Sequence, residues 1–279
     1  MEIPDVHSER PSIEVRVNNV GLGRLRSPPL LAGEYIVTPV FKISVDLPGH
    51  LKGAHLSRIY EAFTSVMKPF NRLDLSVLRR LALRLLEAND YSSRAVVTVK
   101  GRLYYSQSQH EYSSNGFLYA RISVEREGGS ITPVAEYSGG GFYTLTTCPC
   151  AMAVSEYLYG KPFTHMQKVR VNAYIKSRGV SVEPLEVFEL LKNMLQAPRN
   201  YLKRAEEAEL VRAVHEKPFF TEDIARLVSA SLAELLARKN TLDPQSLVYV
   251  TVKSFETIHE YTVESVVKAR AIDLLKDRG

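Results

Sequence analysis

The sequence has no long apolar run, few cysteines and little excess charge of either sign. No window of its 279 residues approaches the ~18 consecutive apolar residues that a membrane span requires. Its 15 glycines and 14 prolines are too few and too scattered for a fibrous or disordered chain. The first residues, MEIPDVHSERPS, are polar and acidic where a signal peptide has a basic stretch and then an apolar one. We therefore expect a cytoplasmic globular protein with no membrane partner.

The two cysteines stand together as Cys148-Pro149-Cys150. Neighbours this close, separated by a proline, are badly placed for an intramolecular disulfide, which fits a reducing cytosol. The net charge of +5 is spread evenly, with 17 Lys and Arg against 14 Asp and Glu in residues 1–140 and 19 against 17 in residues 141–279. No basic tail or arm is present. The charge therefore suits a phosphorylated small molecule as well as a polyanion, and we expect no nucleic-acid partner.

Hydrophobic periodicity predicts two successive groups of strands and helices. A period of two, typical of half-buried antiparallel strands, occurs in residues 37–47, 94–104, 117–124, 169–175 and 248–252. A helical period occurs in residues 56–67, 75–87, 185–195, 205–215 and 222–237, the last with Thr221 as its expected N-cap. Because the order of strands, helices and strands occurs twice, we predict an α+β fold of two tandem antiparallel-sheet modules with helices on one face. The pair Gly128-Gly129 divides them into residues 1–129 and 130–279.

Cys148 and His165 are candidate metal ligands. They lie 17 residues apart, the first in an expected loop and the second at the start of a strand. A thiolate, an imidazole and a carboxylate can hold a divalent metal ion and leave one position open for water. The cysteines alone also fit a simpler interpretation, two small buried thiols beside a turn-forming proline.

Three further groups of residues could bind or convert a substrate. Glu256 and His259 follow an apolar strand, where a carboxylate can accept two parallel N–H bonds from a guanine edge or simply face solvent. Lys52, His55 and Arg58 start a predicted helix, which suits a phosphate group or a solvated basic turn. Glu216 lies between a helix and Pro218; it is an ordinary loop residue by itself, and the adjacent His215 is a rival ligand.

Taken in chain order, these segments resemble one family. The segments are Asp46-Leu47-Pro48, Lys52-Gly53-x-His55-x-Ser57-Arg58, Thr-x-Cys148-Pro-Cys150, His165-x-Gln167-Lys168, Glu216-x-Pro218-x-Phe-x-Glu222-Asp223 and Phe255-Glu256-x-Ile258-His259. They are similar to motifs of the type IB GTP cyclohydrolases, from about residue 12 to about residue 265. The resemblance implies a tunnelling fold, whose tandem modules assemble into barrels. It also implies a metal-dependent conversion of GTP to a dihydroneopterin phosphate with release of formate.

The same resemblance implies roles for the candidate residues. Cys148, His165 and Glu216 would hold one divalent metal ion that activates water for attack on C8 of guanine. Glu256 would anchor the guanine edge and His259 would give a proton to the departing nitrogen. The phosphate charge would be neutralised by Lys52, His55 and Arg58. The family also implies a homo-oligomer, a dimer or tetramer with active sites near the subunit interfaces.

One departure from the bacterial pattern favours the archaeal branch of the family. Gly160 is followed by Lys161-Pro162-Phe163-Thr164 before His165, and Lys168 stands in place of an arginine. The archaeal branch forms the 2′,3′-cyclic phosphate of dihydroneopterin and is typically iron-dependent, whereas the bacterial branch forms the triphosphate. The ligand types themselves accept Fe²⁺, Zn²⁺ or Mn²⁺.

Two other functions remain open from the sequence. A deazaguanine nitrile reductase of the same fold would use the cysteine as a nucleophile and would need NADPH in place of a metal; the pairing of His165 with Glu216 argues against it. A non-catalytic nucleotide-binding or RNA-binding module with structural zinc is disfavoured because the positive charge is not concentrated.

Overall fold

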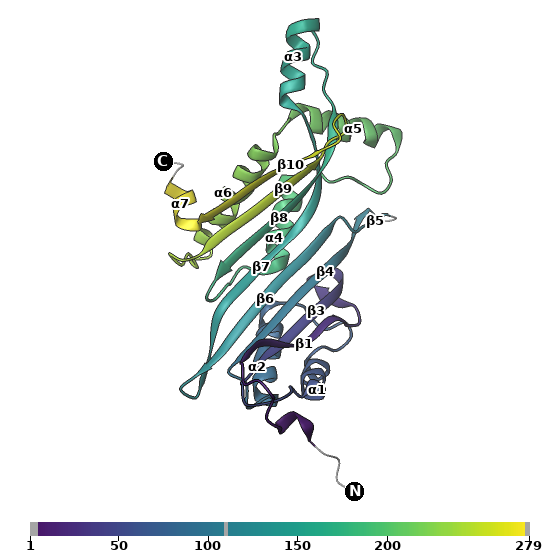
Figure 1. The fold of residues 1–279 in the computed structure, drawn as a ribbon. Coiled ribbons are helices and arrows are strands. Elements are labelled where there is room, and N and C mark those ends of the chain that lie inside the picture. The colour runs from purple at the N-terminus through teal and green to yellow at the C-terminus, as the bar shows by residue number, and fades with distance from the viewer. Residues whose placement is uncertain (1–4, 109–110, 277–279) are drawn as a thin grey trace. The chain divides into compact units, whose positions relative to one another are not determined.

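A computed structural model describes residues 5–108 and 111–276 (Figure 1). The chain divides into two compact units. Unit 1 comprises the described residues up to Arg102 together with Tyr119–Tyr137, and unit 2 comprises Leu103–Leu118 together with the described residues from Ser138. The boundary expected after residue 129 lies in the turn between strands β6 and β7, where Gly128 and Gly129 have φ values of 55° and 88°. Unit 1 continues past this turn because both strands contribute residues to both units.

Unit 1 is an antiparallel sheet with the strand order β1-β3-β4-β6-β7, in which β2 also pairs with β3. Its strands are β1 (Val17–Arg26), β2 (Leu30–Ala32), β3 (Tyr35–Leu47) and the unit 1 portions of β4 (Arg94–Ser108), β6 (Gly116–Glu127) and β7 (Ser130–Thr147); its helices are η1 (Val6–Ser8), α1 (Leu56–Val66) and α2 (Leu75–Ala88). Alternate residues of β3 are buried along its first half, as its sequence predicts. Phe63 of α1 packs edge-on against Phe41 of β3, with ring centroids 5.1 Å apart. This contact joins the helical layer to the sheet.

An ion pair with a buried carboxylate also connects a helix to the sheet of unit 1. Nε and Nη2 of Arg79 in α2 each donate to a different oxygen of Glu136 in β7 at 2.7 Å. The Glu136 side chain is fully buried. The partners are 57 residues apart, so periodicity within either segment gives no sign of the pair.

Unit 2 is an antiparallel sheet with the strand order β4-β6-β7-β8-β9-β10, in which β5 also pairs with β4. It adds β5 (Glu111–Ser113), β8 (Met166–Ser177), β9 (Leu247–Phe255) and β10 (Thr262–Arg270), with helices α3 (Pro149–Tyr159), α4 (Pro184–Met194), α5 (Arg204–Glu216), α6 (Thr221–Arg238) and α7 (Ala271–Lys276). The register of β9 with both of its neighbours is uninterrupted, and Phe255 faces Lys168 on one side and Thr262 on the other. Phe188 of α4 packs on Phe142 of β7 at 5.8 Å. The core of unit 2 lies between the sheet and its helices.

The five helices predicted from periodicity are confirmed to within one residue at each end. The expected N-cap of α6 is wrong: Phe220 precedes the helix and Thr221 is its first residue. Asp223 accepts the Phe220 N–H at 3.1 Å, so the carboxylate satisfies the end of the helix from inside the first turn. Among the helices that the structure describes, none is long and apolar enough to cross a membrane.

The sequence prediction has no counterpart for η1, β1, β2, β5, β7, β10, α3 or α7. For three of them, β1, α3 and β10, the reason is weak burial. In α3 only Ser155 is buried, so the helix has no apolar stripe to produce a period. In β10 exposed and half-buried residues alternate and none is fully buried. In β1 the register with β3 shifts twice. A periodicity argument detects burial on one face, and these elements bury too little.

Candidate active site

Cys148 lies at the junction between β7 and α3. It is the N-cap residue of α3, and its Sγ accepts the N–H of Ala151 at 3.4 Å. Pro149 at the first position of the helix is favourable because it needs no hydrogen-bond partner there. Cys148 lies between β7 and α3 and belongs to neither, as expected, and its half-buried thiol caps the N-terminus of α3, whereas Cys150 is exposed.

His165 lies next to Cys148 and directly before β8, as expected. The Cys148 N–H donates to the carbonyl of His165 at 3.2 Å. The Thr164 hydroxyl donates to the Cys148 carbonyl at 2.7 Å. These two bonds join the two ends of the segment that contains α3 and the loop after it. The backbone of Cys148 and the backbone of His165 are therefore neighbours, although the two residues are distant in the sequence.

The turn between β9 and β10 brings Glu256 and His259 to the same end of the sheet. Oγ1 of Thr257, in this turn, lies 3.3 Å from Nδ1 of His165, which ties the turn to the Cys148 region. The Ser254 hydroxyl donates to the Glu256 carboxylate at 2.6 Å. The ring of His259 stacks on Tyr261, with centroids 4.8 Å apart and planes 9° apart.

Glu216 is the last residue of α5, and two threonines of β7 hold the chain around it. Thr146 and Phe219 exchange two bonds, the hydroxyl donating to the carbonyl at 2.8 Å and accepting the N–H at 3.1 Å. The Thr147 hydroxyl donates to the Val214 carbonyl at 3.2 Å. The backbone on both sides of Glu216 is thus fixed beside the residues that precede Cys148.

The carboxylate of Glu216 accepts from Nη1 of Arg212 at 2.7 Å on the exposed side of α5. The rival ligand His215 directs Nδ1 to the Val211 carbonyl of its own helix at 2.8 Å. Among the described residues, the one group of three His, Cys, Asp or Glu whose ligand atoms lie within 4.8 Å of one another is Asp5, His7 and His55. Cys148, His165 and Glu216 supply the donor types of a metal site, but their ligand atoms do not all lie within 4.8 Å of one another, and the Glu216 carboxylate is paired with Arg212. Their role as ligands stays a prediction.

Gln167 belongs to the His165 motif, which by itself implies no role for it. It is buried, and its Oε1 has no hydrogen-bond partner among the described residues. One residue further along, Lys168 pairs with Phe255, so continuing the antiparallel register places Gln167 opposite Glu256. A buried acceptor without a donor is uncommon. No sequence pattern could reveal it because its burial depends on packing between distant segments.

The predicted phosphate-binding residues all belong to unit 1, where two of them have carboxylate partners. Nζ of Lys52 lies 2.6 Å from Glu9, and Nη1 of Arg58 lies 3.8 Å from Asp90. The backbone N–H of His55 donates to the Tyr91 hydroxyl at 3.1 Å. Only half of each Lys52 and Arg58 side chain is exposed. A phosphate group would compete with these pairs.

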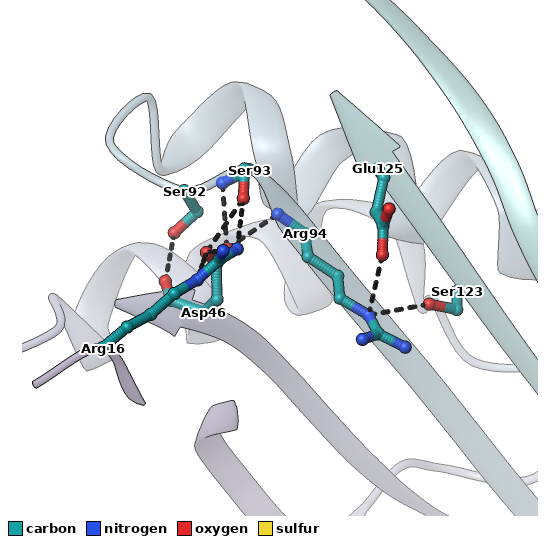
Figure 2. Close-up of polar contacts among 7 residues, drawn as sticks. All are labelled: Arg16, Asp46, Ser92, Ser93, Arg94, Ser123 and Glu125. Carbon is teal, nitrogen blue, oxygen red and sulfur yellow. Dashed lines mark hydrogen bonds and ion pairs between the residues drawn. The ribbon is translucent and has the colours of Figure 1, made fainter. Parts of the chain in front are cut away.

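The Asp46-Leu47-Pro48 motif holds unit 1 together (Figure 2). Oδ1 of Asp46 accepts the backbone N–H groups of Ser93 and Arg94 at 2.9 and 2.7 Å. Its Oδ2 accepts from Nη2 of Arg16 at 2.7 Å and from the Ser93 hydroxyl at 3.0 Å. Burial raises the pKa of Asp46, but the hydrogen bonds from Arg94, Arg16 and Ser93 outweigh it and keep the pKa below its ordinary value. Asp46 is therefore an ionised structural anchor between the end of β3 and the start of β4.

Comparisons with known proteins agree with the motifs and with the fold. A model of the family described as "Type I GTP cyclohydrolase folE2" matches residues 3–265. Similar proteins include the GTP cyclohydrolase MptA of Thermoplasma volcanium, 28% identical over 98% of this chain and 97% of that protein. The GTP cyclohydrolase FolE2 of Fervidobacterium nodosum is 26% identical over 97% of this chain and 99% of that protein.

Solved structures with the same arrangement include urate oxidase from Bacillus sp. TB-90, with a TM-score of 0.52 and 12% identity over 91% of this chain and 100% of that one. At this identity the likeness concerns the fold alone, and it confirms the predicted α+β tunnelling fold. The family model covers nearly the whole chain and confirms the resemblance of the motifs. The chain therefore belongs to the type I GTP cyclohydrolase family of enzymes.

Proposed function

We propose that this protein is a metal-dependent GTP cyclohydrolase that opens the guanine imidazole ring at C8 and forms a 7,8-dihydroneopterin phosphate. The observation that carries the proposal is the set of contacts joining Cys148, His165 and the β9–β10 turn. These contacts gather a thiol, two imidazoles and a carboxylate at one end of the unit 2 sheet. Hydrolysis, first of the ring and then of the formamide, releases C8 as formate.

The substrate base is held at the end of β9 in this proposal. The Glu256 carboxylate accepts two N–H groups of the guanine edge, a pairing that suits a planar donor pair. Ser254 already orients this carboxylate, so little side-chain freedom is lost on binding. The Gln167 amide lies on the neighbouring strand, and its Oε1 accepts a third donor from the substrate.

Cys148, His165 and Glu216 would hold one divalent metal ion, and Fe²⁺ is favoured over Zn²⁺ or Mn²⁺ if the enzyme is of the archaeal type. When bound, such an ion activates water for attack at C8. Thr257 supports His165 by occupying its Nδ1 position, which leaves Nε2 as the ligand atom. His259 holds the proton that the departing nitrogen receives. Its stacking on Tyr261 fixes the plane of the ring.

A homo-oligomer, dimer or tetramer, would complete the site. Several large apolar side chains of α3 and the adjoining segments are exposed in the single chain: Val154, Tyr157, Leu158, Tyr159, Phe163 and Ile258. An apolar surface of this kind next to a catalytic site is typical of an interface. Light scattering of the purified chain measures the subunit count, and a monomer that retains full activity would contradict this part of the proposal.

Product analysis tests the function directly. The chain is freed of metal, supplied under anaerobic conditions with Fe²⁺, Zn²⁺ or Mn²⁺, and incubated with GTP. We expect formate and a fluorescent pterin after oxidation, and mass analysis separates the 2′,3′-cyclic phosphate from the triphosphate. The cyclic phosphate is expected because the link before His165 resembles the archaeal pattern. GTP that stays intact with every metal would overturn the proposal.

Gln167→Met is expected to raise KM for GTP by about tenfold to a hundredfold, because a lost hydrogen bond to a neutral donor in a buried site is worth about 1–3 kcal/mol. Methionine keeps the volume of the side chain and removes its acceptor. The measurement is steady-state kinetics together with metal content. If KM stays unchanged while kcat falls, Gln167 does not contact the bound base.

A further inference from the structure

Two histidines and an aspartate meet in unit 1, and neither Asp5 nor His7 is among the residues assigned to the reaction. The ligand atoms of Asp5, His7 and His55 all lie within 4.8 Å of one another. Nδ1 of His7 is 3.3 Å from Oδ1 of Asp5. The rings of His7 and His55 have centroids 4.6 Å apart and planes inclined by 35°.

Backbone contacts bring these residues together. The Gly53 N–H donates to the His7 carbonyl at 3.2 Å, and the Lys52 N–H donates to the Glu9 carbonyl at 2.9 Å. A Cβ atom at position 53 would lie only 3.0 Å from Cδ2 of His7, so the glycine allows the close approach. The segment that follows Asp5 is thus docked on the chain just before α1 by main-chain bonds, independently of the three side chains.

We propose that Asp5, His7 and His55 form a binding site for a divalent transition-metal ion, separate from the Cys148 site. Two imidazoles and one carboxylate favour ions such as Co²⁺, Zn²⁺ or Fe²⁺ over Mg²⁺ or Ca²⁺, which prefer oxygen ligands. Ligands about 2.1 Å from a metal lie roughly 3–3.5 Å apart. The His7–Asp5 pair already has this separation, and a ring nitrogen of the half-buried His55 lies within 4.8 Å of both ligand atoms.

The surroundings of the cluster suit a cation. The Ser8 hydroxyl donates to Oδ2 of Asp5 at 2.6 Å, an outer contact that orients the ligating carboxylate. The nearby cations Lys52 and Arg58 face Glu9 and Asp90, which offsets their repulsion of a metal ion.

This site gives His55 a different role from direct phosphate binding. Three protein ligands leave further coordination positions to water or to an anionic oxygen. The ion would also join the segment around His7 to the start of α1. The inference does not depend on the proposed reaction, because it uses none of the ligands in unit 2.

Cobalt binding tests the inference in a chain without an affinity tag and with Cys148→Ala as the common background. The substitution removes the thiolate ligand of the predicted Cys148 site. Co²⁺ at that site would then show no thiolate-to-metal absorption bands. The protein is treated with EDTA and titrated with Co²⁺ in a calorimeter. We expect one equivalent of Co²⁺ per chain in this background. Adding His7→Ala or Asp5→Asn is expected to weaken that binding at least tenfold.

The matched control is His50→Ala in the same background, because His50 is an exposed histidine outside the cluster. We expect it to bind Co²⁺ as the parent does. Retention of full affinity in His7→Ala, equal loss in His50→Ala, or no binding in the parent would each overturn the inference. Thermal unfolding without metal confirms that the variants are folded. Pterin formation is scored in the chain that keeps Cys148, and Co²⁺ binding in the Cys148→Ala background, so a failed reaction and an absent second metal site are distinguishable.

Discussion

Replacing Cys148 by alanine is expected to abolish pterin formation from GTP, with kcat lowered by at least about 10³-fold. The physical reason is the loss of a thiolate from a three-residue ligand set, which leaves His165 and Glu216 to hold an ion that they bind weakly. Activation of water by a metal ion is worth several kcal/mol of barrier, and each 1.36 kcal/mol is about tenfold in rate. The assay follows formate and pterin release under anaerobic conditions, with metal content measured on the same sample.

Cys150→Ala is the matched control for that experiment. Cys150 lies two positions along the chain and is exposed, whereas Cys148 is half-buried with its sulfur accepting the Ala151 N–H. We expect Cys150→Ala to keep metal and to change kcat by less than about tenfold. Normal turnover in Cys148→Ala would remove this residue from the metal site. Equal loss in both variants would mean that the motif is needed as a unit.

The sequence predicts the helices of this fold well because their burial is one-sided. In α2, for example, the stripe of Leu78, Leu81 and Leu85 is buried, and periodicity marks it. Helix α3 could not be found this way, although Pro149 near its start and Gly160 at its end are helix signals. Its apolar residues face outward. Periodicity has nothing to detect in a helix without a buried apolar stripe.

The candidate site is predictable in its residue types and less so in its geometry. The adjacency of Cys148 and His165 follows from motif spacing and is observed as a backbone bond. The link to the β9–β10 turn through Thr257 has no sequence signal, because a hydroxyl 92 residues from its histidine partner leaves no local pattern. Glu216 is anchored near Cys148 by its backbone, yet its carboxylate is paired with Arg212. The sequence motif therefore predicts the position of the Glu216 backbone better than the direction of the Glu216 side chain.

The Asp46 motif shows that a family signature need not be catalytic. Its carboxylate is 3% exposed, and the five hydrogen bonds that it accepts all come from Arg16, Ser93 and Arg94 of unit 1 (Figure 2). No other titratable side chain in this network is as deeply buried. We therefore expect a substitution of Asp46 to affect mainly stability, whereas a substitution of Cys148 is expected to affect mainly activity.

Asp46→Ala is expected to lower the free energy of unfolding of unit 1 by about 2–6 kcal/mol, because two backbone N–H groups lose their acceptor and each such loss costs about 1–3 kcal/mol. The N–H groups of Ser93 and Arg94 lose their acceptor, and Arg16 loses its carboxylate. Urea unfolding measures the change, and hydrogen exchange at the Ser93 and Arg94 amides localises it. The control is Asp90→Ala, an exposed carboxylate whose removal is expected to cost less than about 1 kcal/mol.

The pH dependence of stability follows from the lowered pKa of Asp46. Because the folded state holds this carboxylate ionised, its contribution is fully present above the unfolded-state pKa of about 3.9. It is lost as the pH falls below that value and through the lower folded-state pKa. Wild-type stability should therefore fall from about pH 4 downward more steeply than that of Asp46→Asn, which has no proton to bind at this position. Parallel curves for the two proteins below pH 4 would mean that the ionised form of Asp46 does not stabilise unit 1.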